Sequence, residues 1–178
     1  MSDTYANVYD DGTIRIDRSE HGWHLQTLPA VTTLLVTENC KIVVIKEKKD
    51  STGRWVVNCP GGMIEQGESS EAAAAREAEE ETGLVPTKLT KFATVRTDFP
   101  DTYVDYYLGG NLRQGQKASW VIAGDEEIES AKEYSWNEVY EMALATEFHD
   151  PRLCVAVLQL ARQPELLRDF GLLDGDGA

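Results

Sequence analysis

The sequence predicts one α/β domain built on a mixed β-sheet. Runs of apolar, β-branched residues lie before and after a single alanine-rich segment, and two helix-capping patterns follow near the C-terminus. Strands on both sides of one helix, followed by two terminal helices, are typical of a sheet with helices packed against it. The 178 residues suit one domain with a substantial core and a short extension.

Residues 1–28 predict a small β-rich N-terminal arm. An Asp-Gly turn signal lies at 11–12, residues 13–16 alternate as a short strand, and residues 23–25 favour a second strand. The arm either packs on its own domain or contacts a second copy of the chain, and we expect a homodimer.

The main domain is expected over residues 29–173 and begins with a β-hairpin. Its strands are predicted at 31–36 and 42–45, where apolar β-branched residues dominate. The charged, glycine-ended segment 46–53 is typical of a surface loop, and a further strand is predicted at 55–57.

Two more strands are predicted after the alanine-rich segment, at 88–96 and 103–108. The segments that follow are expected to be turns at 109–111 and 113–116, a strand at 120–123 and an acidic loop at 125–129.

Two helices are predicted near the C-terminus. Ser135 and Glu138 form a capping box that opens the first. Asp150 caps the second, which has proline in its first turn and extends to about residue 162. Residues 174–178 are expected to be a disordered tail.

The segment from Gly61 to Leu84 carries the chemistry. Its glycines favour a turning loop, Ser69 or Ser70 can cap a helix, the alanines favour that helix strongly, and Gly83 suits the position just past its end.

On this predicted helix Glu77, Glu80 and Glu81 share one face, because they are three and four residues apart. Carboxylate oxygens gathered beside a glycine loop are the ligands that Mg²⁺ or Mn²⁺ prefers. The alternative interpretation is an acidic helix face that is merely solvated.

The order of residues favours the first interpretation. The pattern G-x5-E-x7-R-E-(apolar)-x-E-E-x-G-(apolar), which begins at Gly62 and ends at Leu84, resembles the Nudix box of the Nudix hydrolases at every position. Ala78 is smaller than the residue that the family usually carries there. The resemblance implies a Nudix-type α/β/α sandwich, with residues 29–173 as the Nudix domain.

The resemblance also implies hydrolysis of a nucleoside diphosphate linked to another moiety, with Mg²⁺ or, as a substitute, Mn²⁺. Glu77 and Glu81 would be direct metal ligands, and Glu80 would be either a ligand or a partner of the ligands. The backbone carbonyl of Gly61 would complete the shell, and Glu65 is a weaker ligand candidate. The positions with a supporting role are Gly62, Glu68, Arg76 and Gly83, of which Glu68 and Arg76 would hold the loop against the helix.

The catalytic base lies outside the box in many members of the family, on a distal acidic loop. Glu126 and Glu127 are the candidates, and Glu80 is a further candidate for a catalytic role. Glu126 and Glu127 could each equally be a solvated loop residue.

The substrate is indicated more weakly than the reaction. ADP-ribose pyrophosphatases commonly have a proline fifteen or sixteen residues after the box, and Pro100 is the sixteenth after Leu84. The alternative is a loop proline that separates two strands. The substrate-binding candidates are Arg54, Arg96, Phe99 and Pro100, and the candidates for stacking on a base are Trp23, Phe99, Tyr103 and Phe148.

We therefore expect a pyrophosphatase that acts on ADP-ribose or a nucleotide sugar and releases AMP or another nucleoside monophosphate with a sugar phosphate. One alternative is hydrolysis of a nucleoside triphosphate or other nucleotide. An alternative of another class is a non-catalytic Nudix domain that senses nucleotides.

Composition excludes several other classes. A formal net charge of −14 disfavours nucleic acid and anionic membranes as partners, which leaves a small-molecule nucleotide substrate. The three cysteines lack paired spacing and indicate free thiols in a reducing compartment. We find no signal peptide and no apolar run long enough for a membrane helix, so we expect a cytoplasmic protein.

Overall fold

The computed structural model describes residues 5–49, 53–115, 126–145 and 150–173; at Lys49, Glu126, Glu127 and Glu129 it describes only the backbone. The elements, in chain order, are β1 (Ala6–Asp10), β2 (Ile14–Ser19), β3 (Gly22–Thr27), β4 (Ala30–Val36), β5 (Ile42–Lys49), β6 (Arg54–Asn58), α1 (Ser70–Thr82), β7 (Leu84–Asp98), β8 (Asp101–Gln114), β9 (Glu126–Tyr134), α2 (Trp136–Leu144), α3 (Pro151–Leu160) and α4 (Pro164–Asp169).

The strands form one mixed sheet, as predicted. Its hydrogen-bonded order is β1-β2-β3-β8-β4-β5-β6, with β7 paired to β8 and β9 paired to β5. β4 is parallel to β8, from Ala30 opposite Val104 to Leu35 opposite Gly109. β7 and β8 form a long antiparallel hairpin, and β5 pairs antiparallel with β4, β6 and β9.

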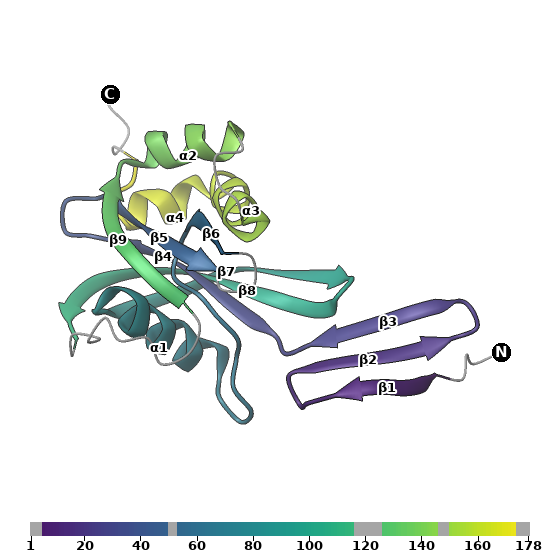
Figure 1. Cartoon of the computed structure of the whole chain (residues 1–178). Helices are drawn as coiled ribbons and strands as arrows, with labels where there is room; N and C mark the ends of the chain where they lie inside the picture. Colours follow the sequence, from purple (N-terminus) through teal and green to yellow (C-terminus); the bar gives the residue numbers. More distant parts are fainter. Residues whose placement is uncertain (1–4, 50–52, 116–125, 146–149, 174–178) are drawn as a thin grey trace.

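Helices cover both faces of this sheet. α1 lies on one face, and α2, α3 and α4 lie on the other (Figure 1). The side chains of β4 alternate between the two layers: Val31 packs in the cluster that contains Ala73 and Ala74 of α1, whereas Leu34 packs with Val157 of α3. This α/β/α sandwich confirms the predicted fold class.

The N-terminal strands extend one edge of the sheet as an arm. β1, β2 and β3 make an antiparallel meander that extends away from the rest of the chain (Figure 1). The meander joins the main sheet where Gln26 of β3 pairs with Asp101 of β8. β1 was not predicted; its five residues are all exposed, so its extended backbone depends on pairing with β2 rather than on burial.

Two predicted surface segments are strands instead. The prediction of a loop at 46–53 is wrong over its first half, because β5 continues to Lys49 between β6 and β9, which satisfy its backbone on both sides. The prediction of an acidic loop at 125–129 is wrong from Glu126 onward. Glu126 and Glu127 open β9, and their backbones lie opposite those of Lys49 and Lys48.

The glycines predicted as a turn at 109–111 lie inside β8, which also runs through Arg113 and Gln114. A Cβ atom at Gly109 would lie 3.0 Å from the side chain of Leu35, and one at Gly110 would lie 3.0 Å from the ring of Phe170. Close packing, rather than a turn, therefore accounts for these glycines.

The remaining predicted elements are confirmed where the structure describes them, and α4 is an additional short helix. The predicted strand at 120–123, Phe148 and the predicted tail at 174–178 lie outside the described residues. None of the helices in the described ranges is both long and apolar enough to span a bilayer.

Candidate active site

The glycine-rich loop leads into α1 as predicted. The side chain of Ser69 caps the helix by accepting a hydrogen bond of 3.2 Å from the backbone N–H of Ala72. The helix ends at Gly83, whose φ of 71° is the left-handed conformation that glycine adopts at little cost, and whose N–H donates to the carbonyl of Glu79.

The loop is fastened to the start of β4. The N–H of Val31 donates to the carbonyl of Gly62 at 2.9 Å, and the N–H of Thr33 donates to the carbonyl of Pro60 at 2.8 Å. A Cβ atom at Gly61 would lie 2.2 Å from the carbonyl oxygen of Val31. The loop backbone therefore lies against β4 as closely as only glycine permits.

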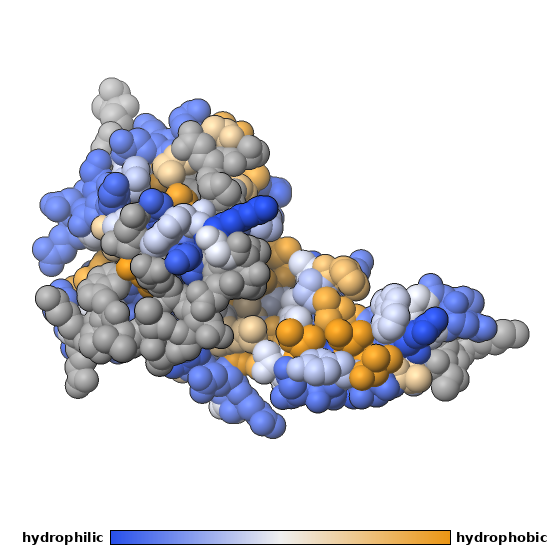
Figure 2. Space-filling view, in the orientation of Figure 1, coloured by the Kyte–Doolittle hydropathy of each residue, from blue (hydrophilic) through white to orange (hydrophobic). Residues whose placement is uncertain are grey.

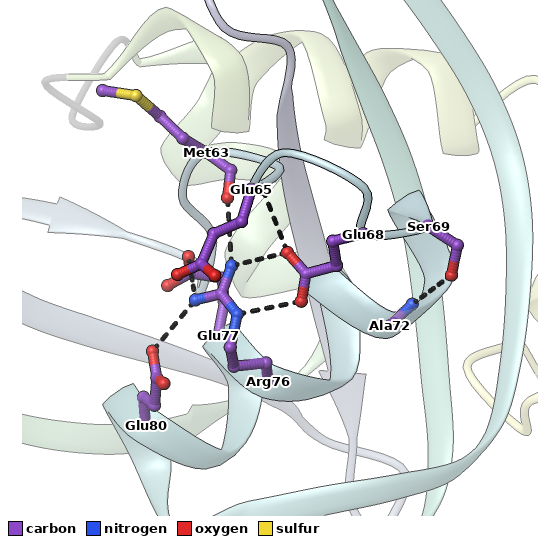
Figure 3. Close-up of polar contacts among 8 residues, drawn as sticks. All are labelled: Met63, Glu65, Glu68, Ser69, Ala72, Arg76, Glu77 and Glu80. Carbon is purple, nitrogen blue, oxygen red and sulfur yellow. Dashed lines mark hydrogen bonds and ion pairs between the residues drawn. The ribbon is translucent and has the colours of Figure 1, made fainter. Parts of the chain in front are cut away.

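Arg76 is the centre of the polar contacts within the segment (Figure 3). Its Nε and one terminal nitrogen each donate to Glu68, both at 3.0 Å, and that terminal nitrogen also donates to the carbonyl of Met63 at 3.0 Å. Its other terminal nitrogen donates to Glu77 at 2.7 Å and to Glu80 at 3.1 Å. One guanidinium thus joins the loop to two carboxylates of the helix.

These contacts favour the charged state of the groups involved. Hydrogen bonding to Glu68 is the largest of the effects that raise the pKa of Arg76, and burial opposes it. The hydrogen bond from Arg76 in turn lowers the pKa of Glu68. The predicted structural pairing of Arg76 with Glu68 is therefore present, and it is ionic.

Gly62 makes room for one of the carboxylates. A Cβ atom at this position would lie 2.3 Å from Oε1 of Glu77. The Glu77 carboxylate therefore lies directly against the loop backbone, in space that any larger residue at position 62 would fill.

Glu81 lies deeper than the other two acids. It is buried, whereas Glu80 is exposed. Its Oε2 accepts a hydrogen bond of 3.1 Å from the N–H of Gly61. The three glutamates on one helix face therefore all lie next to the Gly61–Gly62 loop or the guanidinium that holds it.

This arrangement suits a hard divalent cation in its chemistry, because it offers carboxylate oxygens beside a glycine backbone. As the side chains stand, the described part of the chain holds no group of three His, Cys, Asp or Glu side chains disposed around one metal position. Arg76 engages both Glu77 and Glu80. A cation at this place would compete with one nitrogen of Arg76 for those two carboxylates.

The chain is similar to a known protein family over most of its length. The NUDIX domain family matches residues 26–155 of the chain, which include the loop and α1. The chain belongs to the Nudix family.

Individual Nudix proteins agree with this assignment. Over 133 residues the chain is 30% identical to the ADP-ribose pyrophosphatase of Bacillus subtilis, covering 74% of this chain and 71% of that protein. Over 110 residues it is 37% identical to the ADP-ribose pyrophosphatase of Methanocaldococcus jannaschii, covering 57% and 64% respectively. The crystal structure of an ADP compounds hydrolase has the same fold, with a TM-score of 0.74, 17% identity and coverage of 97% of this chain and 98% of that one.

The chain is thus a Nudix pyrophosphohydrolase, a class that hydrolyses nucleoside diphosphate derivatives and generally uses divalent metal ions. The segment from Gly62 to Leu84 is its Nudix box. The expectations of the family and of an enzyme are confirmed.

The predicted substrate-binding residues lie on β6 and on the β7–β8 hairpin. Arg96 stacks over the ring of Tyr103, 5.5 Å from its centroid, on the β7–β8 hairpin. Phe99 lies at the tip of this hairpin with 69% of its surface exposed, followed by Pro100 after a cis peptide bond. Arg54 is an exposed residue at the start of β6. The side chains of Glu126 and Glu127, the predicted bases, lie outside the described residues.

A cluster of hydrogen-bonded polar side chains beside the box was not predicted from the sequence. Asn58, two residues before Pro60, donates to Glu47 at 3.2 Å and to Asp150 at 3.4 Å, and Asp150 is held by the side chain of Arg152. Glu47 is 1% exposed. Two residues could have indicated this cluster in the sequence, because Glu47 and Asn58 are polar residues next to apolar strand runs. Burying a polar side chain costs free energy unless it forms hydrogen bonds, so such residues are expected to have partners.

Proposed function

We propose that this Nudix pyrophosphohydrolase cleaves the diphosphate of ADP-ribose or a related nucleotide sugar. The products would be AMP, or another nucleoside monophosphate, and a sugar phosphate such as ribose 5-phosphate. The arrangement of Glu77, Glu80 and Glu81 around the Gly61–Gly62 loop carries the proposal of diphosphate hydrolysis. The ADP-ribose pyrophosphatases among the similar proteins support the choice of substrate.

Mg²⁺ is the proposed metal, with Mn²⁺ as a substitute. Glu77, Glu81 and Glu80 would hold it, together with the carbonyl of Gly61. The space between the Gly62 backbone and the Glu77 carboxylate supports this assignment, because the side chain of any other residue would displace the carboxylate. When bound, such an ion neutralises phosphate oxygens and acidifies a water molecule.

The other residues of the box would keep these groups in place. Glu68 orients Arg76 through two hydrogen bonds, and Arg76 then orients Glu77 and Glu80. Substitution of residues that orient metal ligands commonly lowers metal affinity or activity by about 10- to 100-fold. We assign Glu68 and Arg76 this supporting role.

A general base must also take a proton from the attacking water. We propose that Glu126 or Glu127 does so, with Glu80 as the alternative within the box. Glu80 is exposed, with 58% of its side chain accessible, so solvent can reach it. Substitution of each of the three by Gln separates them, since loss of the base lowers kcat far more than substrate affinity.

Substrate contacts are proposed at Arg54, Arg96, Phe99 and Pro100. Three of these, Arg96, Phe99 and Pro100, belong to the β7–β8 hairpin, where a guanidinium and an exposed ring could meet a phosphate and a base. An increase in KM without a change in kcat would support this role, because such contacts form equally in the ground state and the transition state.

A homodimer is proposed as the working form. Val8 and Trp23 on the arm are 56% and 57% exposed, and Tyr9 is 48% exposed. Figure 2 shows hydrophobic residues gathered on the arm where it approaches the rest of the chain. Exposed apolar residues gathered in one patch are typical of an interaction surface, and a second copy of the chain would cover them. Light scattering on the purified protein tests this; a monomer at all concentrations contradicts it.

One experiment tests the reaction and the substrate together. The purified chain is incubated with Mg²⁺ and, separately, with ADP-ribose, nucleotide sugars, dinucleoside polyphosphates or nucleoside triphosphates, in water enriched in ¹⁸O. AMP and ribose 5-phosphate from ADP-ribose are the expected products, and mass spectrometry identifies which product carries the ¹⁸O and hence which phosphorus was attacked. Preferential turnover of nucleoside triphosphates would favour the alternative substrate class, and no turnover of any compound with Mg²⁺ or Mn²⁺ would overturn the proposal.

A further inference from the structure

The contact between α1 and the sheet is made largely by alanines. The side chains of Ala73, Ala74 and Ala78, on the face of α1 toward the sheet, are fully buried. Alanine side chains allow a close approach, but they project little into the opposing layer. Such a smooth contact does not by itself prevent the helix from shifting along its axis. The axial position of α1 must therefore depend on other contacts.

A hydrogen bond at the first residue of the helix supplies one. The hydroxyl oxygens of Ser70 in α1 and Tyr107 in β8 are 2.6 Å apart. Tyr107 is 5% exposed and packs in the same cluster as Ala73 and Ala74. The contact thus lies next to the alanine face, at the end of the helix that follows the glycine loop.

Asp105 extends this contact into the sheet. It is 3% exposed, two residues before Tyr107 on the same face of β8. Lys91 lies 2.7 Å from one of its carboxylate oxygens, and Thr94 donates to the other at 2.6 Å. The nearby hydroxyl of Ser70 also helps to lower the pKa of Asp105.

The direction of the hydrogen bonds follows from the carboxylate. An ionised carboxylate only accepts, so Lys91 and Thr94 donate to Asp105, whereas either hydroxyl of the Ser70–Tyr107 pair can be the donor. Lys91 and Thr94 hold the carboxylate from the β7 side. Asp105 is therefore anchored to two strands of the sheet, next to the contact between Ser70 and Tyr107.

We propose that Tyr107 and Asp105 are positioning residues, which hold α1 through Ser70 at the axial position where Glu77, Glu80 and Glu81 meet the Gly61–Gly62 loop. The inference rests on the metal site proposed above. Neither residue touches the carboxylates; each acts through the helix. A small axial shift of α1 would move all three acids together relative to a loop that is fastened to β4.

The test measures metal binding on the free, full-length protein. Mn²⁺ affinity is determined by electron paramagnetic resonance for the native chain, Tyr107→Phe and Ser70→Ala, and kcat and KM are measured with the substrate that the panel identifies. We expect Mn²⁺ binding to weaken about tenfold in both variants. We also expect kcat to fall while KM changes little, because the substituted residues do not contact substrate.

Two controls separate positioning from general stability. Val157→Ala removes buried volume from α3, on the opposite face of the sheet, and should lower the melting temperature without changing Mn²⁺ affinity. Ser70→Thr retains the hydroxyl and should restore native affinity. Ser70→Ala removes a single oxygen from the end of a helix. It breaks the same contact and provides the test if Tyr107→Phe does not fold.

Three outcomes overturn the inference. Native Mn²⁺ affinity in both Tyr107→Phe and Ser70→Ala would show that the contact does not position the site. Equal weakening in Val157→Ala would show a general effect of stability. Absence of Mn²⁺ binding by the native chain would instead remove the proposed metal site on which the inference rests, so the two failures are distinguishable.

Discussion

Glu68 and Arg76 form a two-point ion pair, with Nε and one terminal nitrogen of the arginine each 3.0 Å from a different carboxylate oxygen. The pair spans the junction between the glycine loop and α1. Because the same guanidinium also contacts Glu77 and Glu80, the geometry of the loop and that of the helix carboxylates are coupled.

Arg76→Lys should weaken both the fold and the activity. Lysine retains the charge but cannot donate to both oxygens of Glu68 and to Glu77 at the same time. We expect a loss of about 2 kcal/mol in the free energy of unfolding, measured by urea denaturation. Catalytic activity should fall by at least about tenfold. Native activity in Arg76→Lys would show that charge alone is sufficient.

Glu81→Gln should abolish most of the metal-dependent turnover and leave the fold intact. The amide is nearly the same size, and its oxygen can still accept from the N–H of Gly61. We expect kcat to fall by at least about 100-fold at saturating Mg²⁺. Glu71→Gln, which removes a charge from the exposed first turn of the same helix, is the matched control and should retain activity. Similar rates for the two variants would refute the assignment of Glu81 as a ligand.

Gly62→Ala should impair function more than stability. The new Cβ atom would meet the Glu77 carboxylate, which is the mobile end of a side chain and can move aside. We therefore expect a large loss of Mn²⁺ affinity with a small change in melting temperature. Gly67→Ala in the same loop is the control, because its φ of 84° causes strain of about 1–2 kcal/mol while nothing lies within 4 Å of the added atom. If Gly67→Ala lost metal affinity to the same extent, loop strain rather than contact with Glu77 would be responsible.

The ion pair at Asp105 should make stability depend on pH in the acid range. Burial alone would raise the pKa of Asp105, but hydrogen bonds from Lys91, Thr94 and Ser70 outweigh it and lower the pKa below its ordinary value of 3.8. A lowered folded-state pKa means that the carboxylate stabilises the fold above the unfolded-state value, and that this contribution is lost as the pH falls through the folded-state value.

The comparison is between the native chain and Asp105→Asn, by urea denaturation from pH 7 to pH 3. The difference in unfolding free energy should be constant down to about pH 5 and should shrink below about pH 4. A difference that stays constant down to pH 3 would contradict the assignment of Asp105 as an ionised anchor.

Much of this molecule was predictable because the signals are local. The capping serine, the alanines and the glycine at the helix end all lie within the box, and helical spacing alone places Glu77, Glu80 and Glu81 on one face. The apolar runs at 31–36 and 42–45 likewise predicted the central strands. Where predictions failed, at 46–49, 109–111 and 126–129, pairing or packing with distant strands overrode local composition.

By itself, then, the sequence determined the α/β class, the Nudix box and the reaction type that the box implies, because these depend on residues close together along the chain. Only the tertiary structure decided which groups surround the box. Ser70 and Tyr107 are 37 residues apart, and Asn58 and Asp150 are 92 residues apart, yet each pair forms a hydrogen bond. Contacts of this kind depend on strand order and on the packing of α1, neither of which leaves a periodic pattern in the sequence.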